Sequence, residues 1–121
     1  HILKLYGRNV IKQELRNEQR DSDNNYLRKL YSQVRKLMTR EDIKLDIPAT
    51  KLLNEALQSS KTLETVYQFK QQLKELWLKS STNHTKRVQR LQEWCAEAEA
   101  SGIQSLQDFA CYLRSYTLLA T

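Results

Sequence analysis

Glycine and proline are almost absent from this sequence, with two Gly and one Pro among 121 residues. Both residue types interrupt helices, and phosphate-binding loops, tight turns and β-sandwiches depend on glycine. Good helix formers, chiefly Leu, Lys, Gln, Glu, Arg and Ala, fill most of the remaining positions. The sequence therefore predicts an all-α fold built from long helices.

Apolar residues recur at helical spacing in successive segments that short polar breaks separate. The clearest stripe is Leu27, Leu30, Tyr31, Val34, Leu37 and Met38. We expect five or six helices with short connections, arranged as a bundle or an orthogonal array, in a single domain over residues 1–121. Residues 41–47 alternate apolar with charged side chains, and we expect an extended connector there.

Polar residues and glycine at the breaks predict where individual helices begin and end. Side-chain oxygens of Ser, Asp and Asn cap helix N-termini, and glycine adopts the left-handed conformation that follows many C-termini. The predicted signals are Ser22 or Asp23 before the second helix, Asp46 with Pro48 before the third, Gly102 after the fifth, and a Ser105–Asp108 capping box before the sixth.

The net charge of +6 is distributed unevenly along the chain. Between residues 24 and 40 there are five basic residues and no acid, so this helix has a basic face that suits phosphates of nucleic acid or of anionic lipid. The alternative is an ordinary solvated helix face. The candidate contact residues are Arg28, Lys29, Arg35, Lys36 and Arg40.

Residues for catalysis or metal binding are few. His1 and His84 stand in unrelated contexts, and no histidine box or nucleotide-binding glycine motif occurs. Cys95 and Cys111 fall on apolar stripes, so we expect buried free thiols. Glu93 and Glu97 share a helix face but point away from the apolar stripe, which indicates a solvated acidic ridge. We predict no catalytic, metal or cofactor residue in this chain.

A second functional reading comes from the pI of about 9.4 and the same basic helix. These features would suit a free-standing helical module that binds nucleic acid. The chain lacks a helix-turn-helix glycine turn and any recognisable RNA-binding motif. We keep this module as the alternative reading.

Four segments resemble bacterial integral-membrane fatty acid desaturases. They are LYGRNVIKQELRNE, RKLYSQVRKLMTRED, LLNEALQSSKTLETVYQFKQQLKELWLKSS and EWCAEAEASGIQSLQDFACYLRSYTL, of which the last is the most specific. The resemblance implies that the chain is the C-terminal cytoplasmic domain of such an enzyme, with residues 1–20 as a juxtamembrane helix.

This resemblance also implies a function and partners. The parent enzyme would use two irons and O2 to insert a cis double bond into acyl chains, while this segment would be a non-catalytic accessory domain. Its partners would be the desaturase membrane domain in cis and anionic lipid headgroups or an acidic electron donor, at the cytoplasmic face of the inner membrane. Nucleic acid is not expected as a partner in this reading. No apolar run approaches the roughly 20 residues of a membrane span, so the chain would be a soluble fragment of a larger membrane protein.

Overall fold

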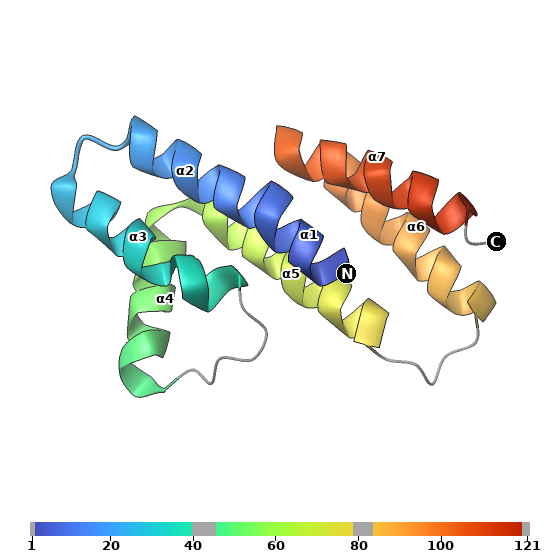
Figure 1. Cartoon of the computed structure of the whole chain (residues 1–121), viewed down its shortest axis with the longest axis horizontal. Coiled ribbons are helices and arrows are strands. Elements are labelled where there is room, and N and C mark those ends of the chain that lie inside the picture. Colours follow the sequence, from blue (N-terminus) through green and yellow to red (C-terminus); the bar gives the residue numbers. More distant parts are fainter. Residues whose placement is uncertain (1, 40–45, 79–83, 120–121) are drawn as a thin grey trace. The chain divides into compact units, whose positions relative to one another are not determined.

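The computed structural model describes residues 2–39, 46–78 and 84–119, and all the regular structure within these ranges is helical (Figure 1). Six helices follow one another along the chain, the first of which contains a π-helical segment. The prediction of an all-α fold with five to six helices is therefore confirmed. Most of the connector predicted at residues 41–47 lies outside the described residues.

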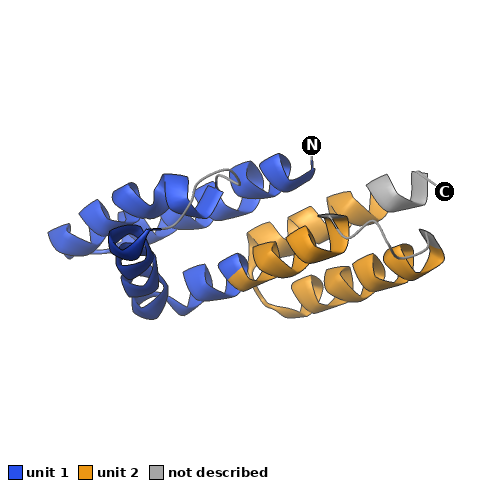
Figure 2. Cartoon of the chain, turned by 90° about the horizontal axis from the view of Figure 1, so that it is seen from below, with its two compact units in different colours: residues 1–67 blue, residues 68–121 orange. Residues whose placement is uncertain are grey.

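The helices form two compact units, His1–Tyr67 and Gln68–Thr121 (Figure 2). The boundary falls within α5 (Lys61–Leu78), so one helix belongs to both units. Because a shared helix is compatible with one domain or with two, the predicted single domain stays a prediction.

The first helix of the first unit is α1 (Ile2–Tyr6), η1 (Gly7–Ile11) and α2 (Lys12–Asp21) in unbroken succession. Within η1 the backbone widens into a π turn, in which the Lys12 amide donates to the carbonyl of Gly7. The inner side of this helix is fully buried at Tyr6, whose hydroxyl donates to the carbonyl oxygen of Val66 in α5.

Two further helices, α3 (Asn25–Thr39) and α4 (Ile47–Ser59), complete this unit together with the start of α5. Asn24 caps α3, because its Oδ1 accepts from the amides of Tyr26 (2.8 Å) and Leu27 (3.4 Å). The predicted cap, Ser22 or Asp23, was therefore wrong by one or two residues.

The cap predicted for α4 is confirmed. Asp46 Oδ1 accepts from the Ala49 amide at 2.9 Å, and Pro48 occupies the first turn, where no intrahelical donor is needed. Ser60 plays the same part for α5, since its Oγ accepts from the Leu63 amide at 3.2 Å.

In the second unit, α6 (His84–Ala100) packs against α7 (Gln104–Leu119), and Trp94 of α6 contacts Phe69 in the later part of α5. Trp94 of α6 is at its centre: its Nε1 donates to the carbonyl of Phe69 at 3.0 Å, and its ring meets those of Phe69 and Phe109 edge to face. Such aromatic clusters combine a large buried apolar area with a fixed geometry.

The turn between α6 and α7 depends on Gly102, which adopts a φ of +77°, as predicted for a glycine after a helix C-terminus. The predicted capping box at Ser105 and Asp108 was wrong. α7 begins at Gln104, so Ser105 already lies inside its first turn, and the Asp108 carboxylate instead accepts from Gln104 Nε2 at 2.8 Å.

None of the helices described here is both long and apolar enough to cross a membrane.

Candidate functional site

The basic residues predicted on α3 are exposed where the structure describes them. Arg28 and Arg35 are seven residues apart, as are Lys29 and Lys36, so each pair repeats after two helical turns and all four share one broad face. Arg40 lies outside the described residues. The described part of α3 therefore has the predicted basic face, and contact of this face with a partner stays a prediction.

The opposite side of α3 explains why these cations face outwards. Its buried residues are at most 2% exposed and pack into the core of the first unit, which leaves the other side of the helix to solvent. They are Leu30, Tyr31, Val34 and Met38.

One of the four cations has a structural partner. Arg28 Nε donates to the carbonyl of Ser22 at 2.7 Å, and the carbonyl of Arg28 accepts from Gln19 Nε2 at 3.0 Å. Both bonds fasten the loop between α2 and α3. Arg28 therefore positions the α2–α3 hairpin, which leaves Lys29, Arg35 and Lys36 as the better candidates for contact with a partner.

A second basic surface, which the sequence interpretation missed, runs along the first helix. Basic residues occur at every fourth position over its whole length, and four of the five are exposed while Lys12 is partly exposed. We call this set the basic ladder: Lys4, Arg8, Lys12, Arg16 and Arg20.

The π turn helps to keep the basic ladder on one side of the helix. Residues four apart in an α-helix are offset by about 40°, so five of them would otherwise spiral around it. A π turn contains more than four residues, so the step from Arg8 to Lys12 is offset in the opposite direction. π turns occur frequently at functional sites.

Acidic residues of the same helix do not cancel the ladder. Glu14 is only 8% exposed, on the inner side of α2. Asp21 approaches Arg20 at 3.7 Å, but both side chains are at least 70% exposed, where an ion pair is weak. The four-residue spacing of the basic residues was the signal in the sequence. The sequence interpretation missed this spacing because it counted charges along the chain, where Glu14, Glu18 and Asp21 partly balance the basic residues, and did not separate the faces of the helix.

The cysteines differ in their surroundings. Both are free; Cys95 is buried, as expected, but Cys111 is exposed, so its predicted burial was wrong. Burial raises the pKa of the Cys95 thiol to about 11, which keeps it protonated and unreactive at neutral pH. Cys111 lines an open depression of about 380 Å³ together with Glu99, Gln107 and Arg114.

No group of three or more His, Cys, Asp or Glu able to hold a metal occurs among the described residues. His1 lies outside them, and of His84 only the backbone is described, as the first residue of α6. Glu93 and Glu97 are both exposed on α6, as the predicted acidic ridge requires.

Comparison with known proteins gives a consistent result. The model of a transposase family, the ISL3 family of DDE transposases, matches residues 1–118. The chain is similar to the transposase for insertion sequence element IS1001 of Bordetella parapertussis, with 32% identity over 118 residues. That alignment covers 96% of this chain but 28% of the relative's length. No solved structure matches the chain.

These matches overturn the desaturase resemblance. Leu-, Gln- and Lys-rich amphipathic helices are common to many proteins, and the quoted segments contained no histidine ligand that would distinguish a desaturase. The predicted desaturase activity, lipid metabolism and membrane-domain partner were therefore wrong. The juxtamembrane helix predicted at residues 1–20 depended on the same resemblance and has no other support. The predicted place at a membrane face depended on the same resemblance and has no support. The exclusion of nucleic acid as a partner also falls.

Proposed function

Because the chain belongs to the ISL3 family of transposases, we propose that it is a DNA-contacting helical segment of such an enzyme. The relative's name refers to an insertion sequence element, which is a segment of DNA. The basic ladder is the observation that supports this role, and the alternative reading of a basic nucleic-acid-binding module becomes the better one.

The ladder suits duplex DNA in length and charge. From Lys4 to Arg20 it rises about 24 Å at 1.5 Å per residue. Over that distance, duplex DNA presents about 14 phosphate charges, one per 1.7 Å of helix axis. The phosphates along this length therefore outnumber the five cations of the ladder, whose long side chains can reach towards them.

The first unit as a whole, with the ladder included, has a net positive charge. Residues 1–67 contain 13 Lys and Arg against nine Asp and Glu. Lys29, Arg35 and Lys36 on α3 belong to this unit, and α3 packs directly against α2. A positive unit of this kind draws DNA towards the ladder over distances comparable to the Debye length.

The proposed contacts position DNA and do not read its sequence. Phosphate contacts fix register and orientation, whereas sequence is read at base edges in the grooves. This part of the transposase would therefore hold the element in place, and recognition of its sequence would belong to other parts of the enzyme. The prediction that residues 1–121 contain no catalytic residue stays a prediction.

The test measures binding of the chain to a fluorescent DNA duplex of arbitrary sequence. Fluorescence anisotropy reports the binding at several salt concentrations. A double variant, Arg8→Gln with Arg16→Gln, removes two of the five positive charges of the basic ladder. Lys51→Gln with Lys61→Gln is the matched control, because it removes the same charge from exposed positions of the same unit off the ladder.

We expect the ladder variant to bind about 10- to 100-fold more weakly at low salt, with a salt slope smaller by about 1.8. The control should retain most of the affinity and nearly all of the slope. Equal losses in the two variants would show that net charge, and not the ladder, attracts DNA. No binding of the unmodified chain at low salt would refute the proposed function.

A further inference from the structure

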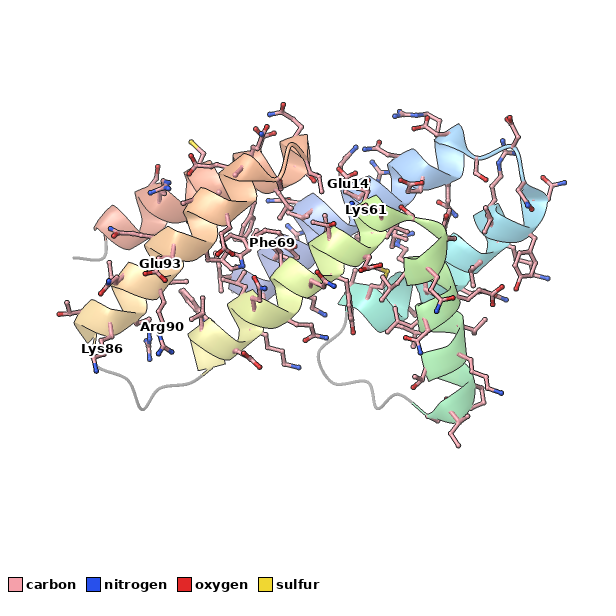
Figure 3. The ribbon with its side chains drawn as sticks, turned by 180° about the vertical axis from the view of Figure 1, so that it is seen from behind. Glu14, Lys61, Phe69, Lys86, Arg90 and Glu93 are labelled. Atoms are coloured by element: carbon pink, nitrogen blue, oxygen red, sulfur yellow. The ribbon has the colours of Figure 1, made fainter. Side chains whose placement is uncertain are left out.

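The exposed side of α6 has an ordered set of charges that DNA binding does not explain. Lys86 and Arg90 lie in its N-terminal half, and Glu93 and Glu97 lie in its C-terminal half, all exposed. Successive spacings of four, three and four residues keep them within about 60° on the helix surface. Figure 3 shows Lys86, Arg90 and Glu93 along one side of α6. We call this set the α6 charge stripe.

The order of these charges opposes the helix dipole. Anions are favourable near a helix N-terminus and cations near its C-terminus, and the α6 charge stripe has the reverse arrangement. α6 also lacks an acid in its first turn and a base in its last. The stripe therefore lowers the stability of an isolated α6 slightly, and a neighbouring helix with the opposite order of charges would offset this cost.

The stripe is symmetric about its own centre. Lys86 and Glu97 are equally distant from the midpoint between Leu91 and Gln92, and so are Arg90 and Glu93. A two-fold axis through that midpoint would turn each cation of one helix onto an anion of an antiparallel copy. Self-complementarity of this kind is the requirement for a symmetric homodimer interface.

We infer that α6 pairs antiparallel with α6 of a second copy of this chain. Lys86 then faces Glu97 of the other copy, and Arg90 faces its Glu93, so that each contact occurs twice. The antiparallel arrangement also places each helix C-terminus beside the other's N-terminus, which offsets the unfavourable order of charges within each helix.

The surroundings of the stripe allow close approach. Gln89, Ala96 and Ala100 border it and are exposed, and two of these are alanines that leave room for a partner's long side chains. Arg90 and Glu93 are near enough along the helix to pair with each other, but no such ion pair is formed in the part of α6 that the structure describes. Exposed ion pairs are individually weak, so the dimer should be reversible and sensitive to salt.

Sedimentation velocity of the 121-residue chain at low ionic strength tests this pairing. Glu93→Lys with Glu97→Lys makes the stripe entirely basic, and Lys86→Glu with Arg90→Glu makes it entirely acidic. Each variant alone should self-associate at least about tenfold more weakly than the unmodified chain, because like charges then meet across the axis. An equimolar mixture of the two should recover association as a heterodimer.

The control is a fourfold variant that combines all of these changes: Lys86→Glu, Arg90→Glu, Glu93→Lys and Glu97→Lys. Its net charge equals that of the unmodified chain and its stripe is again self-complementary, so it should dimerise. Circular dichroism checks that every variant is folded. An unmodified chain that stays monomeric at low salt overturns the inference. The inference is also overturned if the entirely basic or entirely acidic variant self-associates as strongly as the unmodified chain, or if the fourfold variant does not associate. Because no DNA is present and the stripe lies outside the first unit, these outcomes are independent of the DNA-binding proposal.

Discussion

At the scale of single residues, the two cysteines show how a helix position decides chemical behaviour. Cys95 is 1% exposed on the inner side of α6, whereas Cys111 is exposed on α7. A thiol must ionise to react with an electrophile, and burial disfavours the thiolate. The two residues should therefore differ in reactivity.

Iodoacetamide at neutral pH should alkylate Cys111 readily and leave Cys95 unmodified until the chain unfolds. Mass spectrometry of proteolytic peptides measures the two rates separately. Cys111→Ser should abolish the fast reaction and leave the slow one unchanged. Rapid labelling of Cys95 in the folded chain would show that the α6–α7 packing opens far more often than the structure indicates.

Alkaline pH should weaken the fold through Cys95. Its pKa is raised from 9.0 to about 11 in the folded chain, so the folded state holds the proton more tightly than the unfolded state. This contribution to stability is complete below pH 9 and is lost as the pH rises towards 11. Urea unfolding across this range should show a steeper decline for the unmodified chain than for Cys95→Ala.

Tyr6 has a similar effect at higher pH. Burial raises its pKa well above 10, so its contribution to stability persists to a more alkaline pH than that of Cys95. The Cys95→Ala variant should therefore still lose stability above pH 10. A pH profile that is the same with and without the Cys95 thiol would contradict the assignment of the earlier decline to that residue.

At the scale of helices, the residues at which helices begin and end were easier to predict than the charged faces of the helices. Asp46 and Gly102 were predicted because each acts within a few residues: one caps an amide three positions away, and the other supplies a positive φ. Asn24, instead of Ser22 or Asp23, caps α3, because three adjacent polar residues compete for one role. The basic ladder was missed because its members are spread over 17 positions and lie among acids of other faces.

Gly102→Ala should lower the free energy of unfolding by about 1–2 kcal/mol, the cost of a left-handed conformation for a residue with a Cβ. Apart from its two chain neighbours, no residue has an atom within 4 Å of the added Cβ, so this cost comes from the backbone conformation. Chemical denaturation measures it. Gly102→Asn is the control and should cost less, because asparagine tolerates this conformation better. A larger loss in the asparagine variant would argue against backbone strain as the cause.

At the scale of the whole molecule, composition predicted the fold class but not the family. So few Gly and Pro residues favour long helices, and the described parts of the chain contain six helices. Family membership depends on similarity across the whole chain, which runs over residues 1–118, and not on the local phrases that suggested a desaturase. The chain covers 28% of the length of the IS1001 transposase, so the proposed DNA contacts concern one part of such an enzyme.

Stepwise neutralisation of the basic ladder tests the central claim most directly. Lys4, Arg8, Lys12, Arg16 and Arg20 are changed to Gln cumulatively, and the salt dependence of duplex DNA binding is measured at each step. If each side chain meets one phosphate, the slope of log affinity against log salt should decrease by about 0.9 at every step. A slope that stays constant through all five changes would show that DNA, if bound at all, is held elsewhere on the chain.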